Sequence, residues 1–466
     1  MEIDLKEVTG ITIDSREVKP GFIFVAIKGV AQDGHDYVTQ AIANGAKTIL
    51  HQYDLKKEVG INYIQVLDPR IALSELAAKF YPKQPKNILG ITGTSGKSSI
   101  VHFIREILKL MGKKSVSIGT LGVIGDYEVK SNLTTPATID LHNTLQEIVE
   151  HDIDYTAIEC SSHGIDQHRL TSVNFTACGF SNFSHDHLDY HNDMAEYFQA
   201  KKRLFSIMKL GYVVLNMDIP EYEELYNYCL EQGHKAISYG KNPAANIIIE
   251  SIEREGLEQK VTWIIDDFYG QTKLNLVGEF QVYNLACAIG LIMSSGIEIE
   301  NIMPLLPQIN NVPGRMELVS THNKAGIFVD YAHKPEALAQ ALQNLRNNTD
   351  QKLWVIFGCG GDRDQTKRSI MGEIACKYAD HVIITDDNPR SEDPASIRSA
   401  ILKGCDDKAQ EIESREEAIS FAISKLQPRD NLLIAGKGHE NYQIIGNEIM
   451  EFNDKEKVRE ILQLSK

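Results

Sequence analysis

The residues best suited to chemistry in this chain lie in the segment 87–99, which reads NILGITGTSGKSS. Its first half is apolar and β-forming, its second half is rich in glycine, and apolar residues at helical spacing follow over 100–111. This order predicts a strand, a loop and a helix. Such a loop can wrap backbone N–H groups around a phosphate, while Lys97 reaches the outer phosphates and Ser98 ligates Mg²⁺. The segment therefore predicts a binding site for a nucleoside triphosphate.

The glycine spacing departs from that of the standard phosphate-binding loop, because Ile91 stands where the first glycine is usual. Gly90 and Gly93 flank that position, so the segment is a variant of the loop. An ordinary glycine-rich turn is the alternative, which the strand and helix on either side disfavour. The residues predicted to hold the phosphates are Gly93, Thr94, Ser95, Gly96, Lys97, Ser98 and Ser99.

A second group of polar residues follows two apolar strands predicted at 155–160 and 175–180. Glu159 lies at the end of the first strand, and the segment 181–191 after the second holds several Asp and His residues, among them His187. This density suits a metal ion beside phosphates. Zinc is the competing metal, but paired Cys and His spacing is lacking, and oxygen ligands beside a nucleotide favour Mg²⁺.

The composition restricts the class of protein. The chain has 466 residues, 42% of them hydrophobic and 24% charged, which is typical of a globular protein. Its formal net charge of -16 argues against non-specific nucleic-acid binding. The seven cysteines are scattered and predict reduced thiols. Neither a membrane-spanning run nor a signal pattern is found, so a cytoplasmic protein is expected.

The pattern of elements predicts an α/β protein with three domains, covering residues 1–86, 87–313 and 314–466. The first domain has predicted strands at 22–27, 48–50 and 63–66, a helix near 38–46 and a proline-bounded linker at 82–85. Two of its polar loops, one containing Ser15 and the other spanning 28–35, follow strands. Each would be interpreted as a plain turn on its own.

The second domain continues the alternation of strands and helices, which predicts a mainly parallel sheet covered by helices. Ligands bind at the carboxyl ends of the strands in such sheets, and the polar segments 161–169 and 181–191 follow strand ends, while 134–136 lies in a loop. Asn284 opens an apolar helix predicted over 285–294. In isolation it would be a capping or buried polar residue.

Four predicted strands of the third domain each end in a charged, glycine-rich loop. The strands are 327–329, 353–357, 381–385 and 431–435, and the loops are 330–335, 358–364, 386–390 and 436–440. One such loop could be accidental. Four of them predict one open α/β sheet whose carboxyl edge binds a ligand.

Eight motifs occur here in the order found in a known family. They are Gly93-Thr94-Ser95-Gly96-Lys97-Ser98, Thr134-Thr135-Pro136, Ser161-Ser162-His163-Gly164, Asp186-His187-Leu188-Asp189, Tyr283-Asn284-Leu285-Ala286, Pro313-Gly314-Arg315, Asp330-Tyr331-Ala332-His333 and Asp387-Asn388-Pro389-Arg390. Through them the chain resembles the ATP-dependent Mur ligases of bacterial peptidoglycan synthesis over essentially its whole length. The resemblance implies an N-terminal domain for a UDP-linked substrate, a central P-loop ATPase and a C-terminal Rossmann-like domain that brings an amino acid.

The resemblance also implies a reaction. ATP would phosphorylate the D-Glu side-chain carboxylate of UDP-MurNAc-L-Ala-D-Glu, and the amine of meso-diaminopimelate would attack the acyl phosphate. A P-loop, Mg²⁺ and cations suit the charge that develops in these steps. The expected partners are these small molecules, without nucleic acid or membrane insertion, and the protein is expected to be a monomer.

Carried over by position, the resemblance assigns roles to single residues. Lys97, Glu159, His187 and Lys201 would form the catalytic set, and the metal ligands would be Ser98, Glu159, His187 and a CO₂-derived carbamate on Lys201. Further ATP contacts would come from Asn284, Arg315 and Asp330, the last through the ribose. The UDP-linked dipeptide would be held by Ser15, Thr134, Thr135, Ser161, Gln167 and Arg169. Diaminopimelate would be held by Arg363, Asp387, Asn388, Pro389, Arg390, Gly436 and Glu440.

The chain departs from the family pattern at three places. Ser95 stands where Asn is common, and the chain before Ile11 is short. The segment Val30-Ala31-Gln32 differs from the commoner His-Gln-Ala, which leaves the uridine contacts open.

Several alternatives stay open from the sequence alone. Lys201 could be a solvated helix lysine, and Arg390 could cap a helix that begins near Pro394. The ligase could be the lysine-adding relative or a folylpolyglutamate synthetase, and a nucleotide-binding switch or scaffold without catalysis is the alternative from another class. Arg390 favours diaminopimelate, because a guanidinium can hold the second carboxylate through two parallel hydrogen bonds.

Overall fold

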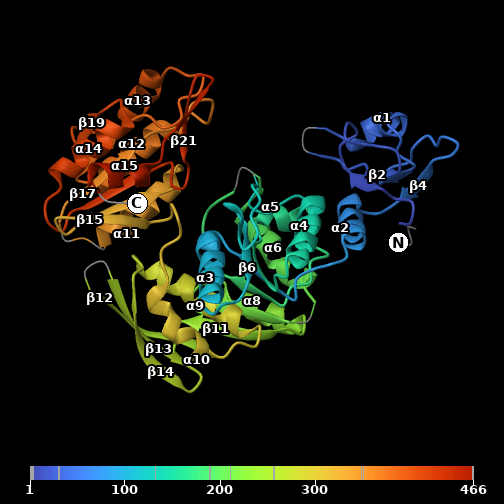
Figure 1. Cartoon of the computed structure of the whole chain (residues 1–466), viewed down its shortest axis with the longest axis horizontal. Helices are drawn as coiled ribbons and strands as arrows, with labels where there is room; N and C mark the ends of the chain where they lie inside the picture. Colours follow the sequence, from blue (N-terminus) through green and yellow to red (C-terminus); the bar gives the residue numbers. More distant parts are fainter. Residues whose placement is uncertain are drawn as a thin grey trace. The chain divides into compact units, whose positions relative to one another are not determined.

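The computed structural model describes residues 5–29, 32–131, 133–187, 190–209, 211–255, 258–347, 349 and 351–463. Val30, Ala31, Leu188 and Asp189 of the motifs above lie outside the described residues. The chain forms two compact units, one of Met1–Ser251, Thr262–Gly270 and Tyr283–Leu306, the other of Ile252–Val261, Gln271–Val282 and Pro307–Lys466. Strands alternate with helices through most of both (Figure 1).

The first unit begins with a four-stranded parallel sheet in the order β1-β2-β3-β4. Its elements are β1 Gly10–Thr12, β2 Phe22–Val25, η1 Gly34–Tyr37, α1 Val38–Ala43, β3 Thr48–His51, β4 Asn62–Gln65 and α2 Pro69–Phe80. The strands and α1 confirm the predicted positions, whereas α2 lacked a sequence prediction. This helix begins with a proline after Asp68, whose side chain accepts a hydrogen bond from the Arg70 N–H.

A ten-stranded sheet follows in the order β14-β13-β12-β11-β10-β9-β5-β8-β6-β7. Its strands are β5 Asn87–Thr92, β6 Ser115–Gly119, β7 Gly122–Gly125, β8 Tyr155–Glu159, β9 Ala177–Phe180, β10 Tyr212–Asn216, β11 Lys235–Gly240, β12 Ile247–Glu255, β13 Glu258–Ile265 and β14 Phe268–Leu274. The helices between and after them are α3 Lys97–Leu110, α4 Thr138–Glu150, α5 Ser162–Asp166, α6 Met194–Lys202, α7 Leu204–Ile207, α8 Tyr222–Glu231, α9 Glu279–Met293, α10 Ile299–Ile302 and η2 Met303–Gln308.

The centre of this sheet is parallel, which confirms the prediction. β5 pairs in parallel with both β8 and β9, β9 pairs in parallel with β10, and β7 runs antiparallel to β6. All six residues of β5 are buried, as expected for a parallel strand covered on both faces. The strands β12 to β14 lacked a sequence prediction.

The second unit contains a six-stranded sheet in the order β15-β16-β20-β17-β18-β19 and a hairpin of β21 and β22. Its strands are β15 Glu317–His322, β16 Ala325–Asp330, β17 Leu353–Phe357, β18 His381–Ile384, β19 Ala409–Glu411, β20 Asn431–Ala435, β21 Tyr442–Ile445 and β22 Glu448–Glu451. Its helices are α11 Pro335–Asn347, α12 Lys367–Tyr378, α13 Pro394–Leu402, α14 Arg415–Lys425 and α15 Asp454–Ile461.

The strand order of this sheet brings four loops to one edge. β16, β20, β17 and β18 are consecutive neighbours and pair in parallel, so the loops after them leave from the same side. Separate apolar clusters cover its two faces, one around Phe328 and Phe357, the other around Ile327 and Ile356. The predicted α/β sheet with a polar carboxyl edge is confirmed.

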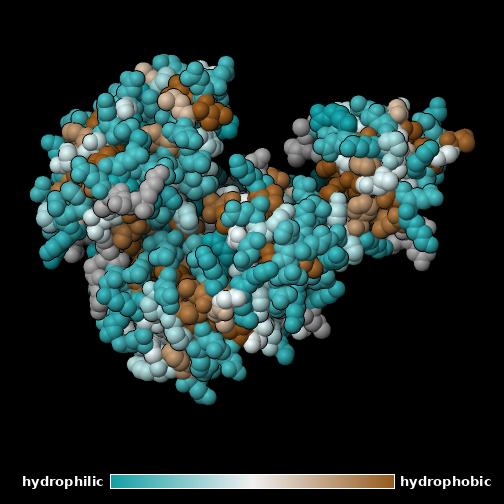
Figure 2. All heavy atoms as spheres, in the orientation of Figure 1, coloured by the Kyte–Doolittle hydropathy of each residue, from teal (hydrophilic) through white to brown (hydrophobic). Residues whose placement is uncertain are grey.

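The visible face of the molecule is mainly hydrophilic, with hydrophobic residues in scattered groups (Figure 2). Within the described part of the chain, no helix is long and apolar enough to cross a membrane.

Candidate functional site

The predicted phosphate-binding loop connects β5 to α3. Gly93 and Gly96 have positive φ values of 138° and 86°, which an L side chain rarely adopts, and α3 begins directly at Lys97. The Lys97 ammonium donates to the carbonyl oxygens of Gly93 and Thr94, both at 2.8 Å. The charge of this lysine therefore lies over the loop, at the N-terminus of a fourteen-residue helix.

Residues from two other elements pack against the loop. A Cβ atom at Gly96 would collide with the Oδ1 of Asn284, and one at Gly93 would collide with the Oγ of Ser181. Asn284 lies within α9 rather than at its start and is 5% exposed, so the capping alternative is wrong and the alternative of a buried polar residue is confirmed. Its side chain lies beside the loop. Asn182 shapes the loop by accepting from the Ser95 N–H at 2.9 Å, a role that the sequence did not reveal.

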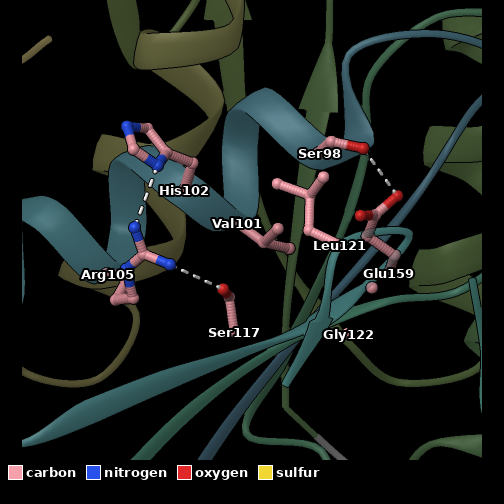
Figure 3. Close-up of a pocket in the computed structure, with 9 residues that line it drawn as sticks. Ser98, Val101, His102, Arg105, Ser117, Leu121, Gly122 and Glu159 are labelled. Carbon is pink, nitrogen blue, oxygen red and sulfur yellow. Dashed lines mark hydrogen bonds between the residues drawn. The ribbon is translucent and has the colours of Figure 1, made fainter. Parts of the chain in front are cut away.

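Glu159 and Ser98 form the acidic side of the site. The Ser98 hydroxyl donates to the Glu159 carboxylate at 3.0 Å, and Figure 3 shows the two side chains pointing toward each other. Thr120, which the sequence analysis missed, donates its N–H to the other carboxylate oxygen at 2.9 Å. Glu159 is only 2% exposed, so these donors stabilise an otherwise buried charge.

A small pocket lies beside this pair (Figure 3), lined by Ser98, Val101, His102, Arg105, Ser117, Gly119, Leu121, Gly122 and Glu159. Arg105 closes its far side, where its guanidinium donates to the Ser117 hydroxyl at 3.3 Å. The pocket is therefore bounded by the carboxylate of Glu159 at one end and by a cation at the other.

Lys201 reaches the phosphate-binding loop from α6. Its ammonium donates to the Gly93 carbonyl at 2.7 Å and lies 4.4 Å from the centre of the Tyr197 ring. The side chain is 1% exposed, which contradicts the alternative of a solvated helix lysine. Burial, together with the positive charge of Lys97, holds the pKa of Lys201 well below its usual value.

His187 lies in an aromatic cluster near this lysine. Its ring centre is 5.8 Å from that of Tyr197 and 5.1 Å from that of His163, and its Nε2 is 3.5 Å from a carboxylate oxygen of Asp186. Tyr197 therefore contacts both His187 and Lys201, two of the residues assigned to the metal.

The donor set suits Mg²⁺ better than zinc. Ser98 and Glu159 offer hydroxyl and carboxylate oxygens at the helix N-terminus where a triphosphate would lie. Among the described residues, no group of three or more His, Cys, Asp or Glu side chains is arranged to hold a metal ion. Mg²⁺ in proteins is usually held by one or two carboxylates together with waters and substrate phosphates, which fits this donor set.

Five of the six residues assigned to the UDP-linked dipeptide form one network. The Thr135 hydroxyl donates to the Glu159 carbonyl at 2.7 Å and lies 2.9 Å from the Ser161 hydroxyl, and Arg169 donates to the Thr135 carbonyl and to Gln167, both at 2.7 Å. The Thr134 hydroxyl lies 3.1 Å from that of Thr120. Ser15 lies in the turn after β1, where its hydroxyl donates to Gln40 at 2.8 Å.

In the second unit, Asp330 ends β16 with its carboxylate satisfied by backbone donors. Its two oxygens accept from the N–H groups of Met316 at 2.6 Å and Ala332 at 2.8 Å, and burial raises the pKa of Asp330. The Arg315 guanidinium lies 4.9 Å from the centre of the Tyr331 ring. Arg315 and Asp330, both assigned to ATP, are thus held in one corner of the sheet edge.

The loops after β18 and β20 lie in contact. Asn388 donates from Nδ2 to a Glu440 carboxylate oxygen at 3.0 Å, and a Cβ at Gly436 would lie 2.7 Å from an Asp387 carboxylate oxygen. Burial raises the pKa of Glu440. The structure therefore brings Asp387, Asn388, Gly436 and Glu440 together at the carboxyl edge.

Two arginines approach Gly360, which lies in the loop after β17. A Cβ at Gly360 would lie 2.7 Å from Nη1 of Arg390 and 3.8 Å from Cγ of Arg363. Arg390, whose φ is 52°, donates from Nη1 to the Gly361 carbonyl at 2.8 Å. The N-cap of α13 is Asp393, whose side chain accepts from the Ser396 N–H, so the alternative of Arg390 as a helix cap is wrong.

The fold and the site define a class of protein: an α/β enzyme in which a phosphate-binding loop in a central parallel sheet is combined with a separate α/β domain. Family models match the chain in three places. The model described as "Mur ligase family, catalytic domain" matches residues 7–81, "Mur ligase middle domain" matches 91–292 and "Mur ligase, glutamate ligase domain" matches 314–438. The chain belongs to the Mur ligase family.

Several proteins similar to this chain share one name. The chain is 44% identical over 463 residues to the UDP-N-acetylmuramoyl-L-alanyl-D-glutamate--2,6-diaminopimelate ligase of Bradyrhizobium diazoefficiens, covering 97% of this chain and 94% of the relative. It is 41% identical to the protein of that name from Agrobacterium fabrum, covering 99% and 94%. A solved structure of that name is 30% identical, with a TM-score of 0.75 and coverage of 99% and 97%. The chain is therefore a ligase, and the alternative of a non-catalytic switch is wrong.

Proposed function

We propose that this protein is an ATP-dependent ligase that adds meso-diaminopimelate to UDP-MurNAc-L-Ala-D-Glu, releasing ADP and phosphate. The observation that carries the proposal is that Arg363 and Arg390 both approach Gly360, and that Arg390 also lies 3.5 Å from the carbonyl of Asn388, whose side chain donates to Glu440. Diaminopimelate has two carboxylates and two ammonium groups. Two guanidinium groups and a carboxylate match that pattern, whereas lysine would leave one guanidinium unused.

The reaction makes a carboxylate electrophilic. The D-Glu side-chain carboxylate attacks the γ-phosphorus of ATP, the bond from that phosphorus to the β-bridging oxygen breaks, and ADP leaves. The amine of diaminopimelate then attacks the acyl phosphate, loses a proton and expels phosphate as the amide forms. Lys97 lies where it can neutralise the charge that builds on the transferred phosphoryl group.

Ser98 and Glu159 would hold Mg²⁺, with His187 as a further ligand. A bound Mg²⁺ neutralises phosphate charge and orients the phosphoryl group. The Glu159 carboxylate accepts three hydrogen bonds from Ser98 and Thr120, which would orient it before a metal ion binds.

Lys201 would be converted to a carbamate. Its lowered pKa favours the neutral amine, whose nitrogen can attack the carbon of CO₂, form an N–C bond and lose a proton. The product is an anion beside the Lys97 ammonium, so the two side chains would attract each other instead of repelling as two ammonium groups would. That both lysines contact the Gly93 carbonyl supports the assignment.

The proposal extends to the organisation of the protein. Residues 1–86 would bind the uridine nucleotide, 87–313 would bind ATP, and 314–466 would bring the amino acid. We further propose that it acts as a monomer in the cytoplasm, where ATP is available, on small molecules and without nucleic acid.

Phosphate release tests the proposal. Purified protein with ATP, Mg²⁺ and UDP-MurNAc-L-Ala-D-Glu should release phosphate with meso-diaminopimelate and much more slowly with L-lysine. Folyl substrates with glutamate serve as the control for the folylpolyglutamate alternative. Equal rates with L-lysine would favour the lysine-adding relative, and activity only with the folyl substrate would overturn the proposal.

A further inference from the structure

Lys437 is a fully buried lysine inside the proposed amino-acid site, and the reaction above gives it no role. It lies in the loop after β20, is 0% exposed, and its ammonium lies 5.7 Å from the centre of the Tyr442 ring. Its Nζ is 3.2 Å from Oδ1 of Asn388 and 3.5 Å from Oε2 of Glu440. A lysine is rarely buried without partners, so these two contacts are the reason that its charge is tolerated.

The surroundings of Lys437 are charged on several sides. Burial lowers the pKa of Lys437, whereas the carboxylates of Asp387 and Glu440 raise it. Below it, Arg415 and Asp454 form a buried ion pair at 2.7 Å, and Arg415 also donates to the Ala435 carbonyl at the end of β20. The Lys437 ammonium therefore lies beside Glu440, one of the acidic residues that would face a substrate ammonium.

Lys437 and the Ile444 N–H together determine which way the Asn388 amide points. Oδ1 of Asn388 lies 3.2 Å from the Lys437 ammonium and 3.0 Å from the Ile444 N–H, and both of these groups can only donate. A rotated amide would place its NH₂ group against two donors. The oxygen must therefore face Lys437, and Nδ2 must face Glu440, where it donates at 3.0 Å.

Two consequences follow for a ligand. Nδ2 of Asn388 has a second hydrogen, so this amide can offer only a donor to an incoming group. Glu440 receives hydrogen bonds through Oε2, and its other oxygen can accept from an ammonium. A donor and an anionic acceptor side by side match the carboxylate and the ammonium of one amino-acid end.

We propose that Lys437 is a positioning residue that fixes Asn388 as a carboxylate donor and Glu440 as an ammonium acceptor, so that the site selects the zwitterionic end of diaminopimelate that lies away from the reacting amine. Arg390 would share that carboxylate, since its Nη1 lies 3.5 Å from the Asn388 carbonyl. This inference rests on the proposed function, and it explains how L-lysine, which lacks that carboxylate, would be rejected.

Lys437→Met tests the inference, because methionine keeps most of the length and removes the charge. The apparent KM for meso-diaminopimelate should rise at least about ten-fold, while kcat at saturation and the KM for ATP change by less than about three-fold. Lys457→Met is the matched control, because Lys457 lies on α15 and pairs with the surface carboxylates of Glu416 and Glu460. It should leave all three constants unchanged.

Asn388→Asp is the second variant, in case Lys437→Met fails to fold. It keeps an oxygen acceptor toward Lys437 and Ile444, and its added negative charge lies beside the Lys437 ammonium. It replaces the donor that faces Glu440 by a carboxylate oxygen, so it should show the same steep rise in KM for meso-diaminopimelate.

The outcomes separate this inference from the proposed function. If wild-type protein adds meso-diaminopimelate and Asn388→Asp keeps the wild-type KM, the positioning role of Lys437 is overturned and the proposed function is not. A Lys437→Met protein that loses affinity for ATP and diaminopimelate equally would also overturn it, because that pattern marks a general structural role. Wild-type protein inactive with meso-diaminopimelate would overturn the proposed function and this inference with it.

Discussion

Two lysines from different helices donate to a single carbonyl, that of Gly93. Lys97 arrives from α3 at 2.8 Å and Lys201 from α6 at 2.7 Å, and their like charges would repel in a buried site. This repulsion is removed when the two side chains differ in charge. One remains the cation that holds phosphate, and the other loses its proton and becomes the site of the proposed carbamate.

Lys97→Ala should abolish turnover without unfolding the protein. Loss of a charge that acts on a transferred phosphoryl group costs on the order of a thousand-fold or more in rate. Phosphate release measures the effect, and a cooperative thermal melt reports folding. Lys109→Ala in the last turn of the same helix is the control. Near-normal phosphate release by Lys97→Ala would contradict the assignment.

Lys201→Ala should be nearly inactive and should be partly rescued by formate or acetate. A small carboxylate can occupy the space of the missing side chain and supply the anionic oxygen that the carbamate would provide. Lys202→Ala is the matched control, because its ammonium pairs with the exposed carboxylate of Glu224 at 2.6 Å. Full wild-type activity in CO₂-depleted buffer would show that no carbamate is needed.

Arg390→Ala should raise the apparent KM for meso-diaminopimelate steeply and leave the KM for ATP unchanged. Removal of one partner of a buried, charge-assisted contact costs on the order of 2–5 kcal/mol of binding. Steady-state kinetics with each substrate varied in turn measure the effect. If wild-type protein used L-lysine as efficiently as meso-diaminopimelate, this role of Arg390 would be wrong.

At the scale of elements, one buried ion pair joins the first residues of two helices. Arg415 opens α14 and Asp454 opens α15, and the guanidinium donates to the carboxylate at 2.7 and 2.8 Å with both side chains 0% exposed. The same guanidinium donates to the carbonyl of Ala435 at 3.0 Å, so it also anchors the end of β20. The loop that contains Lys437 and Glu440 therefore follows a strand end that Arg415 holds in place.

Asp454→Asn should destabilise the protein by about 3–5 kcal/mol, because it leaves the buried charge of Arg415 without its partner. Denaturant unfolding of the second unit measures the loss. Glu416→Gln, which weakens only a surface ion pair with Lys457, should change the free energy of unfolding by less than about 1 kcal/mol. Equal effects of the two substitutions would show that the buried pair contributes little.

At the scale of the whole molecule, stability should depend on pH through a buried histidine. Burial lowers the pKa of His142 on α4 to about 4, whereas an unfolded chain binds the proton near its ordinary value of 6.5. The unfolded state therefore gains a proton first as the pH falls. The contribution of His142 is fully present above pH 6.5 and is lost as the pH falls toward 4.

Between pH 7 and pH 4 this single group should account for roughly 3 kcal/mol of lost stability. His142→Leu removes the titration, so its free energy of unfolding should fall less over that range. Denaturant unfolding at several pH values measures both proteins. An unchanged pH dependence in the variant would mean that His142 does not carry it.

Much of the site was readable from the sequence because it depends on contiguous residues. A strand, a glycine-rich loop and a helix must follow one another to form the phosphate-binding loop, and all three lie within residues 87–110. In the same way, each charged loop of the second unit follows its own strand directly. The parallel arrangement of those strands was sufficient to predict that their loops share one edge.

The tertiary structure alone decided the contacts between residues far apart in the chain. The bond from Lys201 to Gly93 spans 108 positions, and that from Lys437 to Asn388 spans 49. Local spacing favoured a solvated side chain for Lys201 and gave no signal for Lys437, because the burial of a side chain depends on which distant segments pack over it. The tertiary structure also decided the order of β16, β20, β17 and β18. Hydrogen bonding between strands, rather than position along the chain, determines which loops become neighbours.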